Sequence, residues 1–318
     1  MSQLHTIILD TDPGIDDAMA LLLALASPEI ALIGVTTVFG NSHVAATTRN
    51  ALNLLHFAGR ADIPVAMGAD HPLVLPRGRT GEHVHGPDAI GNIGWDAVHN
   101  PNQRPLAIHA AQFIAETIMQ RPGQVTIVAV GPLTNLALAL QLEPRIAEHV
   151  RAVVVMGGAF LVPGNVSPLA ESNIYRDPHA AAKVFAAGWP LTVAGLDVTT
   201  AVRMDNAYFA ALKESRSRFA EFICRIVPFY QAFHREVRGY RDGAINPHDV
   251  CAIAYVLEPA LFAGEQWRVM VLTDGPARGA TIPDRADRHW STPKVHCLTR
   301  VDSARLLAAF HERISRAL

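Results

Sequence analysis

The stretch LDTDPGIDDA at residues 9–18 constrains this chain more than any other feature of its sequence. Four carboxylates fall within eight positions, and they follow the short apolar run Thr6–Leu9: Asp10, Asp12, Asp16 and Asp17. A run of this kind is typical of a buried strand. Like charges at short range destabilise one another unless a positive partner lies between them. The chain must therefore bring a positive partner to the end of this strand.

The first 200 residues alternate short β-branched runs with helical patterns. The predicted strands are Thr6–Leu9, Ile30–Phe39, Ile63–Met67, Val125–Val130, Ala152–Met156 and Leu191–Gly195. The predicted helices between them include Asp16–Ser27, His43–Ala58 and Pro178–Ala187. Continuously apolar strands that alternate with helices are typical of a parallel sheet covered on both faces. The sequence therefore predicts an α/β fold with an open, mostly parallel, Rossmann-like, doubly wound sheet.

The pattern changes in three places along the chain. Residues 70–105 are rich in Gly, Pro and His and show no period, which predicts a lid or binding loop. Residues 203–258 are helical in pattern apart from a loop near 239–247, and strand-like pieces at 267–300 precede a final helix at 303–318. No internal repeat or linker is visible. We expect residues 1–318 to form a single domain with a helical insertion near the C-terminal half.

Charge and composition exclude several partners. The net charge is −2 and no basic stripe is visible, so nucleic acid is not an expected partner. The apolar run Ala18–Ala26 is nine residues long, whereas a membrane span needs roughly 20. The N-terminal residues lack the basic region of a signal peptide, and the three cysteines form no C-x-x-C pair. We therefore expect a protein of the reducing cytoplasm, without disulfides and without a membrane partner.

Polar and glycine residues follow several of the predicted strands at their carboxyl ends. Asp12 follows the first strand, Asn41 the second and Gly131 the fourth, while Met156 and Asp197 lie at the ends of the next two. Ligands of open parallel sheets bind along this edge. We therefore expect these residues to line one site.

A hard divalent cation would explain the carboxylates around the Pro-Gly turn. Ca²⁺ takes about six to eight oxygen ligands and Mg²⁺ takes fewer. In the alternative interpretation, Asp16 and Asp17 only favour the helix dipole, by about 0.3–1 kcal/mol each, which leaves Asp12 unexplained. An EF-hand does not fit, because Gly14 and Leu21 occupy positions that need oxygen ligands. An aspartyl-phosphate phosphatase motif fits poorly, because Gly14 also stands at its fifth position.

Three smaller motifs leave alternatives open. The pair His83-x-His85 could bind zinc, but it lies in the long loop and not on a strand. His248-Asp249 opens a predicted helix, as an ordinary N-cap or as a functional histidine beside a carboxylate. The groups at 164–165 and 171–173 suit a polyhydroxylated ligand, and they suit turn chemistry and surface exposure equally well.

The combination of motifs resembles a known family. DTDPGIDDA, TTVFGN, HVHG, VGPLTN, VVVMGG, GNVSPLAESN and HDVCAIAY occur in this order, from residue 6 to about residue 256. They cover roughly four-fifths of the chain and are similar to the motifs of the inosine–uridine-preferring nucleoside hydrolases. The resemblance implies a Ca²⁺-dependent enzyme that hydrolyses the N-glycosidic bond of ribonucleosides to free base and ribose. It also implies a homodimer or homotetramer.

The resemblance assigns expected roles to individual residues. The calcium ligands would be Asp12, Asp17, the main-chain carbonyl of Val130, and Asp249. The ribose would be held by Asp16, Asn41, Met156, Asn165, Glu171 and Asn173. Asp12 would also be the general base that activates a metal-bound water, and the transition state would be oxocarbenium-like. His248, together with His85, would lie on the side of the nucleobase.

The sequence also bears on the preferred base, and it leaves two rival functions open. The loops at 70–94, 158–175 and 237–247 contain no tryptophan, which favours pyrimidine or broad preference over a purine-only pocket. Ser172, in GNVSPLAESN, departs from the aromatic or other small residue often found in the family, which bears on base preference. The alternatives are a metal-dependent phosphatase and a nucleoside-binding protein without turnover.

Overall fold

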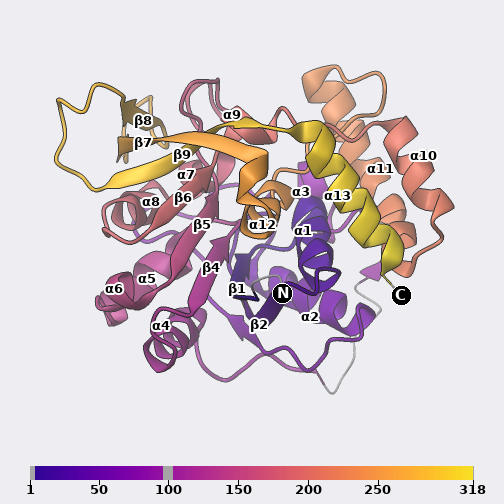
Figure 1. Cartoon of the computed structure of the whole chain (residues 1–318), viewed down its shortest axis with the longest axis horizontal. Coiled ribbons are helices and arrows are strands. Elements are labelled where there is room, and N and C mark those ends of the chain that lie inside the picture. Colours follow the sequence, from indigo (N-terminus) through magenta and orange to yellow (C-terminus); the bar gives the residue numbers. More distant parts are fainter. Residues whose placement is uncertain (1–3, 96–102, 318) are drawn as a thin grey trace.

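The computed structural model describes residues 4–95 and 103–317, and within them the strands form one open nine-stranded sheet (Figure 1). The strands are β1 His5–Thr11, β2 Ile30–Thr37, β3 Val65–Met67, β4 Val125–Ala129, β5 Ala152–Met156, β6 Leu191–Ala194, β7 Phe262–Val271, β8 Thr281–Asp284 and β9 Lys294–Val301. Their order across the sheet is β3-β2-β1-β4-β5-β6-β9-β7-β8. The six strands predicted in the first 200 residues are confirmed, with ends that differ by at most two positions.

The direction of the strands creates a switch point at the centre of the sheet. Strands β1 to β6 all pair in parallel, and β9 continues the parallel set beside β6. From β1 the chain builds outward to β2 and β3, then returns to build β4, β5 and β6 on the other side. Ligands of open α/β sheets bind at such a reversal of strand order. Among the described strands only β7 runs opposite to this set, because it pairs antiparallel with both β9 and β8, and β7 and β8 form the edge beyond β9.

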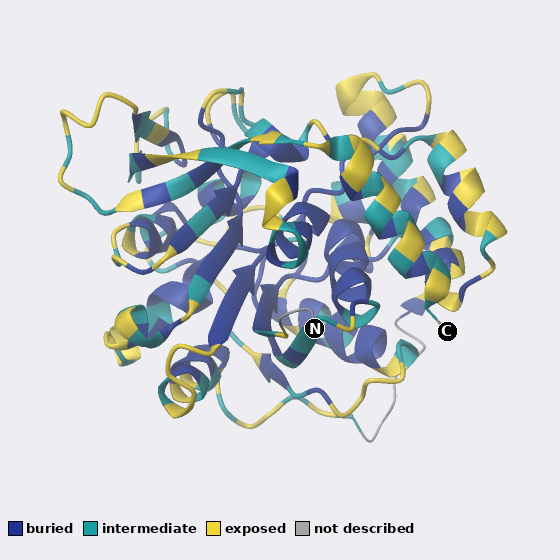
Figure 2. Cartoon of the chain, viewed as in Figure 1, coloured by how far each residue is buried: buried dark blue, intermediate teal, exposed yellow. Residues whose placement is uncertain are grey.

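Helices cover both faces of this sheet (Figure 1). They are α1 Ile15–Leu25, α2 Val44–Phe57, α3 Glu82–His85, α4 Ala110–Gln120, α5 Thr134–Leu142, α6 Ile146–His149, α7 Ser172–Arg176, α8 Pro178–Phe185, α9 Leu196–Thr199, α10 Asn206–Glu214, α11 Arg218–Arg238, α12 Val250–Leu257 and α13 Ser303–Arg316, with a 3-10 turn η2 at Pro259–Leu261. Figure 2 shows the central strands and α1 buried, with teal and yellow on the edge strands and yellow faces on the outer helices. The doubly wound α/β arrangement is therefore confirmed.

Two apolar cores lie on the two faces of the sheet, because successive side chains of a strand point to opposite sides. Ile7 and Leu9 of β1 belong to the core under α1, α2, α11 and α12. Ile8, between them, belongs to the core under α4, α5 and α8. Helix α1 is buried at every position from Ile15 to Ala24. An apolar helix of this kind is stable only in the interior, so the carboxylates of its first turn are buried with it.

The C-terminal half follows the predicted outline. Helices α10 and α11 form the insertion, and the predicted loop at 239–247 separates α11 from α12. The prediction of a loop at 70–105 is wrong in one detail, because α3 forms a helical turn within it. Residues 96–102 of this loop lie outside the described part of the chain. Within residues 4–95 and 103–317 no helix is both long and apolar enough to cross a membrane. The single-domain assignment stays a prediction.

Candidate active site

The carboxylate cluster lies at the switch point, where β1 ends and α1 begins. The turn Pro13-Gly14 joins Asp12 to the first helical turn, which carries Asp16 and Asp17. A Cβ at Gly14 would lie 2.7 Å from Asn41 Nδ2 and 2.8 Å from His85 Nδ1. Both distances are shorter than real Cβ contacts, so this close approach requires glycine.

Asp17 is held in place by four donors from the surrounding backbone and side chains. Its Oδ1 accepts a hydrogen bond from Thr11 Oγ1 at 2.5 Å and one from the Asp12 amide at 3.2 Å. Its Oδ2 accepts from the Gly14 amide at 2.9 Å and from Asn41 Nδ2 at 3.0 Å. These bonds fix the turn Pro13-Gly14. The alternative interpretation, in which Asp17 favours the N-terminus of the helix, therefore accounts for part of its role.

Asp12 has a different environment. Its Oδ2 accepts from the Asn41 amide at 2.6 Å, whereas its Oδ1 is buried and has no hydrogen-bond partner within the described residues. Cβ atoms at Gly40 and Gly131 would lie 2.0 Å and 2.5 Å from the two carboxylate oxygens. The backbone is therefore packed closely around Asp12. A buried carboxylate oxygen without a partner is unfavourable, and a cation would satisfy it.

Three buried aspartates converge beside Asp12. Ligand oxygens of Asp16, Asp17 and Asp249 lie within 4.8 Å of one another. Burial and the charge of Asp17 raise the pKa of Asp16 to about 8, and burial and the neighbouring aspartates raise the pKa of Asp249 well above its usual range. Asp249 makes no side-chain capping bond to α12, so the ordinary N-cap interpretation is not supported. An all-oxygen donor set of this kind fits a hard divalent cation.

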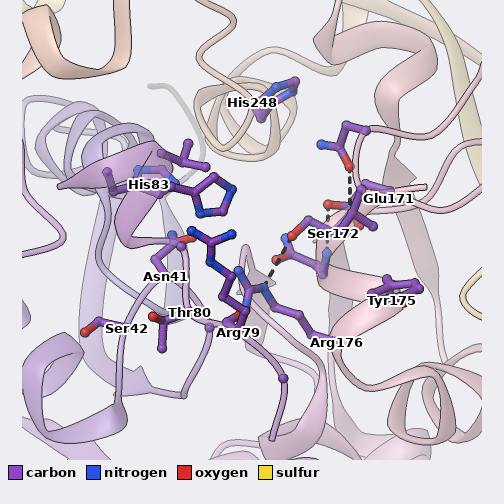
Figure 3. Close-up of a pocket in the computed structure, with 18 of the residues that line it drawn as sticks. Asn41, Ser42, Arg79, Thr80, His83, Glu171, Ser172, Tyr175, Arg176 and His248 are labelled. Carbon is purple, nitrogen blue, oxygen red and sulfur yellow. Dashed lines mark hydrogen bonds between the residues drawn. The ribbon is translucent and has the colours of Figure 1, made fainter. Parts of the chain in front are cut away.

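A cavity of about 390 Å³ opens above this cluster (Figure 3). Ten of the predicted site residues line it: Asp16, Asn41, His85, Val130, Met156, Asn165, Glu171, Asn173, His248 and Asp249. The other two predicted residues, Asp12 and Asp17, are buried and are bonded to the cavity-lining residue Asn41. The fold thus brings the whole predicted set to one place, from segments that are as far apart as β1 and α12.

Glu171 and Asn173 form one wall of the cavity. Glu171 is buried and accepts from the amides of Gly158 at 3.1 Å, Asn173 at 2.8 Å and Ile174 at 3.1 Å, so the surface interpretation is wrong for Glu171. Asn173 Nδ2 donates to the carbonyl of Val130 at 2.8 Å and to that of Met156 at 3.2 Å. A carbonyl oxygen has two lone pairs, so this bond leaves one on Val130 for a ligand.

Asn165 lies at the rim of the same wall. It is exposed, lines the cavity, and accepts a hydrogen bond from the Ser172 amide at 2.9 Å through its Oδ1. The Oδ1 of Asn165 therefore makes a local hydrogen bond, as the turn interpretation predicts. Its amide nitrogen has no described partner and can donate to a ligand in the cavity.

Two of the predicted histidines are buried and neutral. His85 Nδ1 accepts from the Ile15 amide at 3.1 Å, which places the ring proton on Nε2. His248 Nδ1 lies 2.7 Å from Thr199 Oγ1. Burial lowers the pKa of each ring to about 3. Around neutral pH each imidazole can therefore offer one N–H as a hydrogen-bond donor. The other half of the zinc pair considered above, His83, is exposed, and no described metal-ligand cluster contains either histidine.

Sequence reasoning missed several residues of the cavity. His234 of α11 is buried, its two ring nitrogens have no described hydrogen-bond partner, and its ring contacts Tyr230 at 4.4 Å between centroids. The four-residue spacing of Tyr230 and His234 on an apolar helix face was the available signal. Arg176, three residues after the GNVSPLAESN motif, also lines the cavity, and no sequence signal distinguished it from a surface arginine.

Asp10, although adjacent in sequence, lies outside the group of converging aspartates. Its Oδ1 accepts from Thr36 Oγ1 at 2.5 Å and from Asn135 Nδ2 at 2.8 Å, which links β1 to β2 and α5. Burial raises the pKa of Asp10 to about 7, although the two hydrogen bonds oppose this shift. Asp10 therefore connects elements below the cavity and does not reach into it.

The sequence from residue 7 to residue 308 matches the family model described as inosine-uridine preferring nucleoside hydrolase. This chain belongs to that family. Its relatives include the non-specific ribonucleoside hydrolase RihC of Klebsiella pneumoniae, 43% identical over 87% of this chain and 88% of the relative. A probable uridine nucleosidase of Arabidopsis thaliana is 39% identical over 97% of both chains. The inosine-uridine preferring nucleoside hydrolase of Crithidia fasciculata is 38% identical over 93% of this chain and 91% of its own.

Solved structures agree with the nucleoside hydrolase fold. A plant nucleoside hydrolase, PpNRh1, superposes with a TM-score of 0.93 at 37% identity, and the match covers 98% of this chain and 99% of the other. A purine-preferring ribonucleoside hydrolase of Gardnerella vaginalis superposes with a TM-score of 0.91 at 30% identity, over 98% of both chains. The family relationship makes this chain a hydrolase of N-glycosyl compounds that acts on ribonucleosides. The relatives differ in the bases that their names give.

Proposed function

We propose that this nucleoside hydrolase depends on Ca²⁺ and cleaves ribonucleosides to free base and ribose, with pyrimidine or broad base preference. The observation that carries the proposal is the buried, partnerless Oδ1 of Asp12 beside the converging oxygens of Asp16, Asp17 and Asp249. So much negative charge in the interior is stable only beside a cation. These oxygens lie at the floor of a cavity large enough for a substrate, which is where a catalytic cation is needed.

The donor set fits calcium. Asp12, Asp17, Asp249 and the second lone pair of the Val130 carbonyl would hold the ion, all with oxygen. Substrate hydroxyls and water can complete the about six to eight ligands that Ca²⁺ prefers. When bound, the ion would orient a water, lower its pKa and neutralise part of the carboxylate charge.

Asp12 is the proposed general base. Its Oδ2 is fixed by the Asn41 amide, so the direction of the free Oδ1 is defined. Without a cation, burial and the charge of Asp17 keep the pKa of Asp12 well above its usual range, which favours the protonated form of the carboxyl. A neighbouring positive charge lowers this pKa. The ionised Asp12 can then take a proton from the attacking water.

The polar wall is the proposed ribose site. Asp16, Asn41, Asn165, Glu171 and Asn173 present carboxylate and amide groups to the cavity, with Met156 between them. Their hydrogen bonds to the hydroxyls would orient the sugar, and their negative charge favours the positive sugar of an oxocarbenium-like transition state.

His248 and His85 are the proposed contacts of the nucleobase. Each is neutral and can donate one N–H to a base nitrogen or oxygen as negative charge develops there. Among the residues that line the cavity there is no tryptophan, which agrees with pyrimidine or broad preference. The phosphatase alternative is less favoured, because the Oδ1 of Asp10 is bonded to Thr36 and Asn135 and the side chain lies below the cavity.

A comparison of uridine with 2′-deoxyuridine tests the proposal. Hydroxyl contacts at the ribose site orient the sugar for reaction, so we expect release of uracil from uridine and little from the deoxynucleoside. Equal rates would contradict the ribose site. Binding of uridine without release of uracil would favour the alternative of a nucleoside-binding protein. Light scattering of the same sample tests the expected homodimer or homotetramer, and cytoplasmic location stays a prediction.

A further inference from the structure

Four arginines that line the cavity have no carboxylate partner among the described residues: Arg79, Arg176 and Arg278, which lie around α7, and Arg238 at the end of α11. Arg79, Arg176 and Arg278 line the cavity, and within the described residues no carboxylate oxygen lies within 4.0 Å of their nitrogens. Arg77, on the same rim, is different, because its guanidinium pairs with Asp70 at 3.0 Å. The whole chain carries a net charge of −2, so unpaired positive charge at this mouth is a local feature.

Arg176 is the best placed of the three. It is half-buried at the end of α7, its Nε donates to Ser172 Oγ at 3.3 Å, and its Nη1 donates to the Arg79 carbonyl at 3.0 Å. These bonds orient the planar guanidinium and use only part of its five N–H donors. Burial raises the pKa of Asp12 and of Glu171, and the positive charge of Arg176 lies close enough to both carboxyls to oppose this shift. Arg176 therefore belongs to the cavity and not to the outer surface.

Arg278 reaches the same region from the segment before β8. Its guanidinium carbon lies 4.1 Å from the centroid of the Tyr175 ring, and Tyr175 is the neighbour of Arg176 in α7. The Arg278 Nε is buried and has no described hydrogen-bond partner. A buried donor without an acceptor is unfavourable, so an acceptor supplied by a ligand would stabilise this arrangement.

Arg176 and Arg278 lie on the wall that carries the proposed ribose contacts Glu171 and Asn173. Figure 3 shows Glu171, Ser172, Tyr175 and Arg176 on one side of the cavity, with His83 on the opposite side. In ribose the base is attached to C1′ and the 5′ carbon to C4′, on the two flanks of the ring oxygen. A ribose held by Glu171 and Asn173 lies beside Arg176, which follows them on α7 and donates to Ser172, and in the orientation that we propose its 5′ carbon faces this wall.

A neutral 5′-hydroxyl does not need three guanidinium groups, whereas a phosphate dianion does. The rigid fork of N–H donors in arginine matches the oxygens of a phosphate, and such charge-assisted bonds are the strong ones. We propose that the cavity accepts ribonucleoside 5′-monophosphates as substrates, with the phosphate held by Arg79, Arg176 and Arg278. This inference rests on the proposed function, because it uses the same cleavage site and the same orientation of the base.

The reaction remains hydrolysis of the glycosidic bond. The oxygen of one water forms a bond to C1′, the C1′–N bond breaks, and its electron pair leaves with the base. One proton of the water passes to Asp12, and the base takes up a proton, so no oxidant or further reactant is needed. The phosphate ester stays intact, and the products are free base and ribose 5-phosphate.

Release of base from matched pairs tests the inference: uridine with its 5′-monophosphate, and inosine with its 5′-monophosphate. We expect kcat/KM for at least one monophosphate to exceed that of its nucleoside by about tenfold or more. Hydrogen bonds to a charged group typically strengthen binding by about this factor or more. Arg176→Ala should lower the ratio of monophosphate to nucleoside by about 10- to 100-fold, and Arg176→Lys by less, because charge without the fork is retained. The matched control is Arg77→Ala, which removes an already paired charge and should leave the ratio unchanged.

The outcomes separate the two claims. Release of base from the nucleosides and from neither monophosphate overturns the phosphate site and leaves the proposed function intact. Release from neither kind of compound, with Ca²⁺ present, overturns both. An equal fall of the monophosphate-to-nucleoside ratio in Arg77→Ala and Arg176→Ala indicates a general attraction of anions and also overturns the phosphate site. If Arg176→Ala fails to fold, Arg278→Ala replaces it, and inhibition of the wild-type enzyme by ribose 5-phosphate should exceed inhibition by ribose.

Discussion

At the scale of single residues, the proposed chemistry depends on how differently neighbouring aspartates are treated by the fold. Asp17 accepts four hydrogen bonds, whereas Asp10 and Asp12 each keep one buried oxygen without a described partner. Asp10 is bonded to Thr36 and Asn135 below the cavity, and Asp12 is bonded to Asn41, which lines the cavity. The sequence predicted that a cation meets this cluster, because the residues crowd one strand end. Which of the two free oxygens lies beside the cavity depends on contacts such as that of Asp12 with Asn41, and these contacts come from distant segments.

Replacement of Asp12 is the strongest test at this scale. Asp12→Ala removes the proposed base and a proposed metal ligand together, so kcat for ribonucleosides should fall by at least about 10²–10⁴. The matched control is Asp62→Asn, an exposed aspartate whose partner is Arg60, which should retain full activity. Near-normal turnover by a folded Asp12→Ala enzyme would remove the proposed mechanism.

His248 carries the proposed assistance to the leaving base. His248→Ala should lower kcat by about 10²–10⁴, the usual range for a group that transfers a proton in the transition state. His56→Ala, an exposed histidine on α2, is the control for loss of an imidazole. If His248→Ala turns over like the wild type, the assistance to the leaving base belongs to another group. The buried His85 is then the first candidate from the sequence.

At the scale of elements, the strands with continuous apolar runs were predictable because burial on both faces leaves a strong pattern. Helices α4 and α5 were not predicted individually, although both pack on the sheet. The short helix α3 is anchored by a long-range contact that the sequence does not reveal, because the Gly81 amide before it donates to the Asn41 carbonyl at 2.9 Å. The reversed direction of β7 has no local signal either, since strand direction follows from the connections.

The last helix offers a pH-dependent prediction. Arg313 of α13 donates to Glu29, before β2, at 2.7 Å and 2.9 Å, and this holds the pKa of Glu29 below its ordinary value. A depressed pKa stabilises the fold above the unfolded pKa, and the benefit is lost as pH falls through the folded pKa. Glu29→Gln should therefore lower the free energy of unfolding at pH 7 by at most about 1 kcal/mol.

Urea unfolding of this variant and of the wild type, at pH 7 and at successively lower pH, measures the effect. The difference should shrink as pH falls below the pKa of Glu29 in the folded state. Glu312→Gln is the control, because Glu312 pairs with Arg316 on the same helix and both side chains are more than half exposed. A difference that stays constant with pH would show that the Glu29–Arg313 pair is not its source.

At the scale of the whole molecule, the reversal of strand order between β1 and β4 decides where the site can form. It places the end of β1, the Val130 carbonyl after β4 and the wall after β5 around one cavity, and α12 adds His248 and Asp249. The sequence predicted this convergence because parallel strands share one carboxyl edge. His234 and Arg176 escaped prediction, because only the packing of α11 and α7 turns them toward the cavity.

The most direct measurement of the central claim is release of ribose from uridine, cytidine, inosine and adenosine after chelation, and again after Ca²⁺ is restored. The account predicts release that is lost with the chelator and returns with Ca²⁺, with uridine or cytidine at least as fast as the purine nucleosides. Release that persists without Ca²⁺, or no release from any of the four when Ca²⁺ is bound, would contradict it.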